Sequence, residues 1–139
     1  MKAIIDTCVI IDVLQARKPF CETSQKIFLG AATEQYAGCI TAKSVADIYY
    51  LTHRLTHSDK ETRNIISKLF VLFRLTDTTS SDCLHALLSP VSDFEDAIMI
   101  ETAKRVKADC IITRNINDFR DSEISVYTPE EFLEVLQNT

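Results

Sequence analysis

The chain has 139 residues, 46% of them hydrophobic, with only two glycines and three prolines, which fits one domain over residues 1–139 with a full core and no linker. Its formal net charge of −5 excludes a protein that coats nucleic acid through overall positive charge, although a local basic rim stays compatible with it. No apolar stretch approaches the roughly 18 residues of a membrane helix, and Asp6 and Asp12 interrupt what would be the apolar region of a signal peptide, so we expect a cytoplasmic protein without a membrane partner.

The first half of the chain alternates short apolar runs with helical patterns. AII at 3–5 predicts a buried strand that ends at Asp6, and Thr7 is the expected cap of the helix that follows. Residues 20–32 and 59–74 have helical spacing of their apolar residues, and YAGCIT at 36–41 predicts a second strand. Between them, a helix is expected over 42–55, with Thr41 as its cap.

The second half continues the same alternation. A short helix is expected at 80–89, and Ser92 with Glu95 three residues later forms a capping-box pattern for a helix at 93–107. The remaining expected elements are strands at 110–113 and 124–128 and a helix at 129–137 that begins with Pro129. Short apolar strands separated by helices predict an α/β fold whose mainly parallel sheet is covered on both faces.

Several acids are expected to meet at one edge of this sheet, where ligands of parallel sheets gather. Asp6 follows the first strand, residues 113–118 follow the CIIT strand, and Asp96 lies at a helix N-terminus that faces the same crevice. Clustered carboxylates repel one another, so they need protonation, a basic partner or a divalent cation. Mg²⁺ and Mn²⁺ prefer oxygen ligands, and such a site is typical of phosphate chemistry.

Three segments resemble the PIN-domain ribonucleases, a family that includes the toxins of many bacterial toxin–antitoxin pairs. IIDTCVIIDVL resembles the opening strand of the family with its first acid at Asp6. TAKSVADIYYLTHR is similar to the segment that supplies the second acid, here Asp47 where the family usually has Glu. DFEDAIMIETAKRVKADCIITRNINDF resembles the most specific segment, with an acid at Asp96, an apolar helix and a strand that ends in T-R-N/D.

The resemblance implies a PIN-like three-layer α/β/α sandwich that cuts RNA with Mg²⁺ or Mn²⁺. The catalytic residues it implies are Asp6, Asp47, Asp96, Thr113 and Asn115, and the implied metal ligands are Asp6, Asp47, Asp96 and Asp118. Asn115 stands where many relatives carry a fourth acid, and Asp118 either replaces that acid or braces the loop. The expected partners are single-stranded RNA, an antitoxin protein and a second copy of the chain in a homodimer.

Other roles for these residues stay open at this point. Asp96 also suits the positive end of a helix dipole, as do the capping candidates Asp93 and Glu95. Thr113 either hydrogen-bonds the turn or faces a metal-bound water. Asp12 is expected to be a solvated acid on the polar side of its helix. A substrate rim is possible at Arg17, Lys18, Lys43, Arg54 and Arg114, and buried reduced thiols are expected at Cys8, Cys39 and Cys110. His53 and His57 have the i,i+4 spacing of zinc ligands, but the Glu after the first His and a third ligand are missing, so no zinc site is expected.

Two rival functions remain to be weighed. A phosphohydrolase with Asp6 as nucleophile would need D-x-D at the end of the first strand, and position 8 is Cys; a receiver domain would need an acidic pair before the first helix. The second rival is a catalytically weakened module that binds RNA or an antitoxin, and the departures at Asp47 and Asn115 favour it. Divalent-metal binding by the protein separates the nuclease from such a module.

Overall fold

The structure, a computed structural model of residues 1–139, contains five strands, seven α-helices and one 3₁₀-helix. The strands are β1 (Lys2–Ile5), β2 (Ala37–Thr41), β3 (Arg74–Thr76), β4 (Cys110–Ile112) and β5 (Ser125–Tyr127). The α-helices are α1 (Thr7–Leu14), α2 (Cys21–Ala32), α3 (Ala42–Thr56), α4 (Asp59–Leu72), α5 (Ser80–Ala86), α6 (Phe94–Arg105) and α7 (Pro129–Gln137), and the 3₁₀-helix η1 spans Ile116–Phe119.

The five strands form one sheet in the order β3-β2-β1-β4-β5, and every neighbouring pair is parallel. Ala3 of β1 lies opposite Gly38 of β2 on one side and Cys110 of β4 on the other. The chain runs outward from β1 through β2 to β3 and then crosses back to β4 beyond β1. This reversal places a topological switch point between the carboxyl ends of β1 and β4, the usual position of a ligand site in such sheets.

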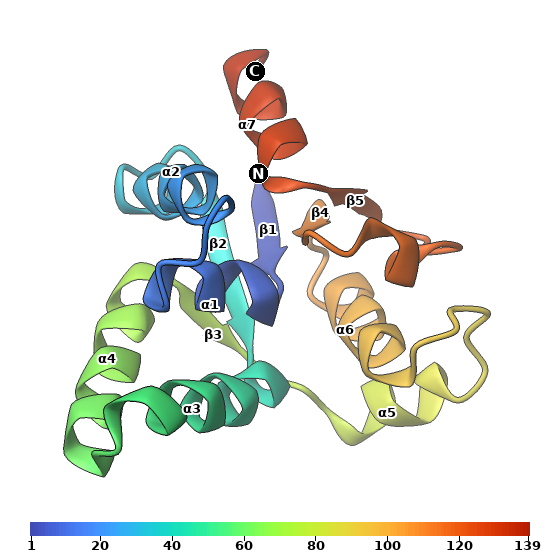
Figure 1. Ribbon diagram of the computed structural model, residues 1–139. Helices are drawn as coiled ribbons and strands as arrows, with labels where there is room; N and C mark the ends of the chain where they lie inside the picture. The colour runs from blue at the N-terminus through green and yellow to red at the C-terminus, as the bar shows by residue number, and fades with distance from the viewer.

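Helices cover both faces of the sheet, as Figure 1 shows with α1 to α4 on one side and α5 and α6 on the other. Successive residues of β1 point to opposite faces: Ala3 and Ile5 pack in the core beneath α1, α2, α3, α4 and α7, whereas Ile4 packs beneath α5, α6 and η1. The buried residues of the central strands β1 and β4 are apolar on both faces, as expected for strands that are covered on both sides. The predicted α/β/α sandwich with a parallel sheet is confirmed.

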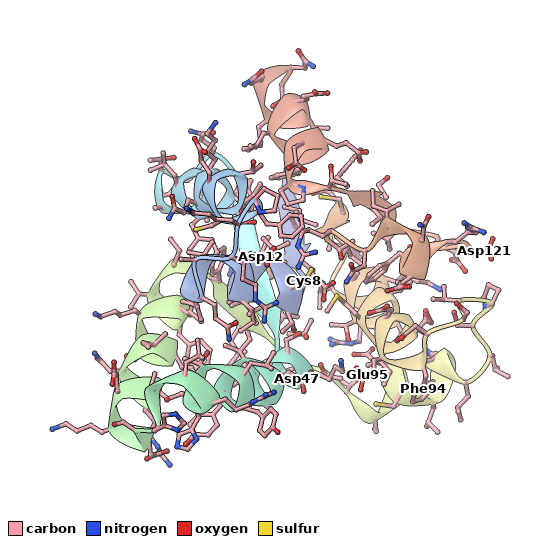
Figure 2. All side chains as sticks on the ribbon, in the orientation of Figure 1. Cys8, Asp12, Asp47, Phe94, Glu95 and Asp121 are labelled. Carbon is pink, nitrogen blue, oxygen red and sulfur yellow. The ribbon has the colours of Figure 1, made fainter.

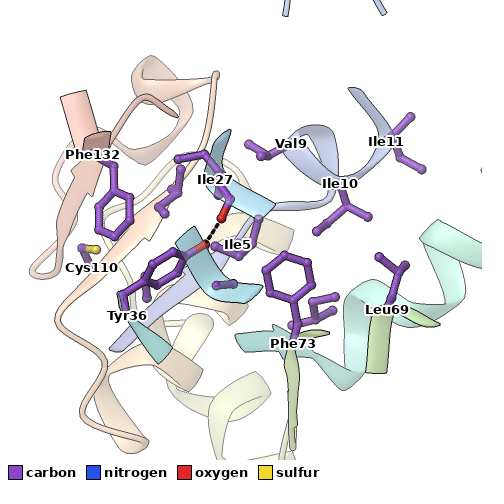
Figure 3. Close-up of a cluster of buried hydrophobic side chains, with 14 of the residues drawn as sticks. Ile5, Val9, Ile10, Ile11, Ile27, Tyr36, Leu69, Phe73, Cys110 and Phe132 are labelled. Atoms are coloured by element: carbon purple, nitrogen blue, oxygen red, sulfur yellow. Dashed lines mark hydrogen bonds between the residues drawn. The ribbon is translucent and has the colours of Figure 1, made fainter. Parts of the chain in front are cut away.

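The larger core contains aromatic side chains whose polar atoms are satisfied (Figure 3). The Tyr36 hydroxyl donates a hydrogen bond to the Ile27 carbonyl at 2.8 Å, so the buried phenol leaves no unpaired donor. Phe132 of α7 packs edge-on against Tyr36 with ring centroids 4.9 Å apart. Burial raises the pKa of Tyr36 well above its usual value, which matches a phenol held protonated in an apolar core.

A buried ion pair that the sequence patterns did not indicate fixes α5 against α6. Asp82 is 2% exposed, and its carboxylate accepts from Arg105 Nε at 2.9 Å and from the Thr102 hydroxyl at 2.7 Å. Burial alone would raise the pKa of Asp82, but the bonds from Arg105, the Thr79 backbone and Thr102 hold it at about 2. The pair keeps α6, and the acids at its first turn, in a fixed position relative to α5.

The structure differs from the predicted elements in several details. β3 was not predicted, because a three-residue edge strand that is largely exposed has no continuous apolar run; the expected helix at 59–74 ends at Leu72 instead. The predicted helix at 80–89 ends at Ala86. No helix of the structure is both long enough and apolar enough to cross a membrane.

Candidate active site

Asp6 lies at the switch point between β1 and β4, and its carboxylate is hydrogen-bonded both to the start of α1 and to the residue after β4. Its backbone N–H donates to the Ile112 carbonyl of β4 at 2.9 Å. Its Oδ1 accepts from the Thr7 N–H at 2.8 Å, and its Oδ2 accepts from the Thr113 hydroxyl at 2.7 Å. Asp6 is therefore the N-cap of α1, and the prediction of Thr7 as the cap is wrong by one residue: Thr7 begins the helix. Asp6 is 9% exposed, and these hydrogen bonds fix the direction of its carboxylate.

Thr113 and Cys8 complete the surroundings of Asp6. The Thr113 side chain is fully buried; its hydroxyl donates to Asp6 and accepts from the Asn115 N–H at 3.0 Å, which holds the loop after β4. The Cys8 thiol donates to Asp6 Oδ2 at 3.5 Å. Burial and the neighbouring Asp6 raise the pKa of Cys8 to about 11, so the sulfur keeps its proton as that donor.

Cys8 therefore differs from the other cysteines for which buried core thiols were predicted. It is half-buried at the margin of the larger core, two residues past the cap of α1, where its thiol contacts Asp6 and Thr113. Cys39 and Cys110 are buried and unbonded, which confirms the prediction for those two.

Asp96 lies in the first turn of α6 and faces the same crevice as Asp6. Asp93, not Ser92, caps this helix, because Asp93 Oδ1 accepts the Asp96 N–H at 3.0 Å; the predicted capping box of Ser92 and Glu95 is wrong. The Asp96 carboxylate accepts no hydrogen bond from the protein. Burial, and then the charges of Asp6, Asp93 and Asp118, raise the pKa of Asp96 to about 7, against a smaller opposite effect of a lysine from α3.

This raised pKa gives a pH dependence of the metal-free protein. The folded pKa of Asp96 lies near 7 and its unfolded pKa near 3.8, so the stabilising contribution of the protonated form is complete below pH 3.8 and is lost as the pH rises through 7. We expect the contribution of Asp96 to the free energy of unfolding to fall between about pH 4 and pH 7 in EDTA, and Asp96→Asn to flatten that slope. Urea titrations at several pH values measure it; equal slopes in the two proteins would contradict the repulsion.

Asp47 is connected to the residues of the crevice only by its ion pair with Lys43. Its side chain is 53% exposed on α3, and Oδ2 lies 3.8 Å from Lys43 Nζ. The same Lys43 ammonium lies 3.4 Å from Glu95 Oε2 at the start of α6. Figure 2 shows Asp47 and Glu95 approaching each other from the two helices. Lys43 therefore bridges α3 and α6, and this bond occupies the Glu95 side chain that the capping-box prediction needed.

The loop after β4 places Asn115 and Asp118 differently. Asn115 is exposed, and the contact that fixes it is made by its backbone, through the N–H bond to Thr113. Asp118 is also exposed, in η1, where its N–H donates to the Asn115 carbonyl at 3.0 Å. The charge of Asp118, rather than the amide of Asn115, acts on Asp96. Asp118 is thus the better placed of the two for an additional ligand.

Arg114 and Asp12 form a buried ion pair behind the site. Arg114 Nη2 donates to Asp12 Oδ1 at 3.1 Å and Nε donates to the other oxygen, while the guanidinium lies 3.9 Å from the centre of the Phe20 ring. Asp12 is fully buried, so the expectation of a solvated acid is wrong. The helix turns Asp12 toward the residue after Thr113, and Arg114 supplies the charge that its burial requires. An acid inside the apolar run VIIDVL was the available signal.

The carboxylate oxygens of the crevice are the type of ligand that a hard divalent cation prefers, but only two carboxylates face each other there. Asp6 and Asp96 offer carboxylate oxygens, and burial together with the charge of Asp6 raises the pKa of Asp96, so a cation would favour its charged form. No three His, Cys, Asp or Glu side chains approach closely enough to hold one ion together. The two histidines of the zinc pattern are engaged elsewhere, with His53 stacked on Tyr49 and His57 ending α3.

Comparison with known proteins agrees with this arrangement. The sequence matches the PIN domain family over residues 2–117. DNA-bound VapBC from Salmonella typhimurium has a similar fold, with a TM-score of 0.69, 16% identity and coverage of 93% of this chain and 98% of that chain. A toxin–antitoxin complex from Klebsiella pneumoniae has a TM-score of 0.66 and 21% identity, and the match covers 91% of this chain and 97% of that chain. VapC20 from Mycobacterium tuberculosis, a sarcin-ricin loop cleaving toxin, has a TM-score of 0.62 and 12% identity, and the match covers 78% of this chain and 86% of that chain. No curated protein matches the sequence. With five parallel strands in this order, the acids at the switch point and a family match over most of its length, the chain belongs to the PIN domain family.

Proposed function

We propose that the protein is a divalent-metal-dependent endoribonuclease that cuts single-stranded RNA. The observation that carries the proposal is the pair of carboxylates at the switch point, Asp6 held rigidly by Thr113 and Asp96 left without a hydrogen-bond donor and with a raised pKa. A pair of this kind gains stability from a cation, and oxygen-only donors suit Mg²⁺ or Mn²⁺. The similarity to a toxin whose description names RNA-loop cleavage supports the same substrate class.

The residues would divide the work as follows. Asp6 and Asp96 would hold the ion, with Asp118 and Asp47 as additional ligands. A bound Mg²⁺ or Mn²⁺ supplies a water of lowered pKa and offsets charge on the leaving oxygen. Thr113 keeps the Asp6 carboxylate in a single orientation across the two strands, and this preorganisation avoids a conformational cost at the moment of reaction.

We further propose that this nuclease is the toxin of a toxin–antitoxin pair and forms a homodimer in the cytoplasm. Several structures of similar fold are complexes of a toxin with its antitoxin, among them the Salmonella and Klebsiella complexes. A cationic side chain of such an antitoxin could block the crevice by pairing with Asp96, whose charged form is disfavoured by burial and by the neighbouring acids.

A direct test measures melting and cleavage together. The purified protein is heated with Mn²⁺ or with EDTA, and the same samples are incubated with end-labelled single-stranded RNA and with a duplex of the same sequence. We expect Mn²⁺ to raise the melting temperature, since an ion that binds only the folded state stabilises it, and to permit cleavage of the single strand alone. Cleavage that persists in EDTA would contradict a metal-dependent nuclease.

A second candidate function, a module that binds RNA or an antitoxin without cutting, has specific support. Asp47 is exposed and paired with Lys43, and an amide stands at Asn115 where relatives carry an acid, so the donor set around Asp6 and Asp96 is smaller. Protein that shows no melting shift with Mn²⁺ and leaves RNA intact would favour this function.

The two loop residues can be separated by a matched pair of substitutions. Asp118→Asn removes a charge that acts on Asp96, and we expect it to weaken Mn²⁺ binding by about 10-fold. Asn115→Asp adds an anionic oxygen to the same loop and is expected to tighten binding if its side chain turns inward. Titration calorimetry in identical buffer compares the variants with the parent. Unchanged affinity in Asp118→Asn would remove Asp118 from the metal site.

A further inference from the structure

One exposed side of α3 carries a row of polar and aromatic side chains that begins at the acids. Its members, called the α3 row below, are Lys43, Asp47, Tyr50 and Arg54. Their spacing of four, three and four residues places them on one side of the helix, and the row is about 16 Å long at 1.5 Å per residue. Its inner end lies at the candidate active site, where Lys43 contacts Glu95 of α6. The row therefore leads outward from the acids.

The outer end of the row combines an exposed ring with an uncompensated cation. Tyr50 is 63% exposed, and the Arg54 guanidinium carbon lies 5.7 Å from the centre of its ring. Arg54 has no acidic partner, in contrast to Arg63 on the neighbouring helix, which is paired with Asp59 at 2.8 Å. Tyr49, the next residue along the helix, is already bonded to Asp59. Tyr50 and Arg54 are thus free to contact a ligand.

A second cation is held beside this end of the row. Gln15 donates from Nε2 to the Leu51 carbonyl of α3 at 3.3 Å and accepts from Arg17 Nε at 3.0 Å. This chain of contacts fixes the direction of the exposed Arg17 side chain and leaves its remaining N–H groups without a protein partner. At the inner end, the charge of Asp47 is offset by Lys43 at 3.8 Å. The outer end of the row is therefore positive, whereas the inner end, where Lys43 is shared between Asp47 and Glu95, keeps an excess of negative charge.

We propose that the α3 row is the binding track for the single-stranded RNA that flanks the cleaved phosphate, with one base stacked on Tyr50 and phosphates bound by Arg54 and Arg17. An aromatic ring with adjacent guanidinium groups is the combination that binds single strands without dependence on sequence. On a chain of net charge −5, cations without acidic partners beside an exposed ring favour a polyanion over an acidic or apolar protein surface. The inference rests on the proposed function for its substrate class.

The test measures binding without cleavage. A fluorescein-labelled 12-nucleotide oligouridylate is titrated with the protein in EDTA, and anisotropy is followed at several salt concentrations. Tyr50→Ala is expected to weaken binding about five-fold or more, the loss of one stacked base, whereas Tyr50→Phe keeps the ring and stays within about two-fold of the parent. Arg54→Gln is expected to reduce the slope of log K against log salt by about 0.7, the value for one phosphate of a single strand. Lys68→Gln, an exposed cation on α4, is the matched control and is expected to leave both quantities unchanged.

Each other outcome is decisive as well. Parent-like binding by both Tyr50→Ala and Arg54→Gln overturns the track, and so does a parent that binds no RNA in EDTA. Conversion of a dimeric parent to a monomer by Tyr50→Ala, seen in sedimentation, would show that the row contacts a second copy and also overturns it. If RNA binding depends on the α3 row but the protein does not cut RNA with Mn²⁺, the track is supported and the nuclease function is refuted. If the protein cuts RNA but substitutions in the α3 row leave its RNA binding unchanged, the nuclease function is supported and the track is refuted.

Discussion

Asp96→Asn is expected to reduce RNA cleavage in Mn²⁺ by at least about 100-fold while leaving the metal-free protein as stable as the parent or more so. The activity falls because an anionic oxygen is removed from the proposed ion, and substitution of residues that only support metal ligands already costs 10–100-fold. The stability is kept or rises because the substitution relieves the repulsion from Asp6, Asp93 and Asp118 that raises the pKa of Asp96. Residues of functional sites often show this opposition of activity and stability.

The measurement is a pair of melts with and without Mn²⁺ beside a cleavage time course. Asp6→Asn serves as the partner variant and is expected to lose the same activity, although it also weakens the bonds from Thr113 and Thr7. Glu130→Gln is the matched control, because Glu130 is an exposed acid in the first turn of α7 and is not among the charges that act on Asp96. Variants of Asp6 and Asp96 that still cut RNA would show that the acids were assigned wrongly.

Arg114→Met is expected to destabilise the protein by about 3–5 kcal/mol. The substitution leaves the carboxylate of Asp12, which is fully buried, without its counter-charge, and a buried charge that loses its partner costs about this much. It also removes the contact with the Phe20 ring. Urea unfolding gives the free energy directly, and the same preparation reports whether the loop between Thr113 and Asn115 still supports cleavage.

The double variant Asp12→Leu with Arg114→Met separates charge burial from packing. Replacement of both partners by apolar groups of similar size is often neutral or stabilising, so we expect the pair to recover most of the loss. A cost of less than about 1 kcal/mol for Arg114→Met alone would mean that water reaches Asp12, and it would remove this pair as a support for the loop.

Much of the fold could be predicted because its strands are buried on both faces. The runs AII and CII are short, continuous and apolar and alternate with helical patterns, which indicated buried parallel strands, and Thr41 caps α3 and Pro129 begins α7 as predicted. β3 escaped because only hydrogen bonds with β2 define it, and its residues RLT carry no apolar pattern. Long-range pairing, not local sequence, decides whether such a short edge segment is a strand.

The site was predicted less completely for the same reason. Asp6 and Asp96 were predicted to face one crevice because each adjoins a strand end or a helix start, and the structure places their charges within reach of each other. That Lys43 would join Asp47 to Glu95 depends on the distance between two helices, which no spacing within α3 reveals. The burial of Asp12 depends likewise on Arg114, 102 residues away. Their roles as metal ligands stay a prediction.

The hydrogen bond from Thr113 to Asp6 joins residues that are 107 positions apart in the chain. Synthesis proceeds from the N-terminus at about 5–20 residues per second, so the first acid exists for roughly 5 to 20 seconds before the residue that orients it has been made. During that interval β1 has no β4 beside it, and the crevice between them does not exist. The proposed catalytic centre therefore cannot be complete before Thr113 has been synthesised. The topology itself delays the onset of activity, which is useful for an enzyme whose proposed substrate is RNA.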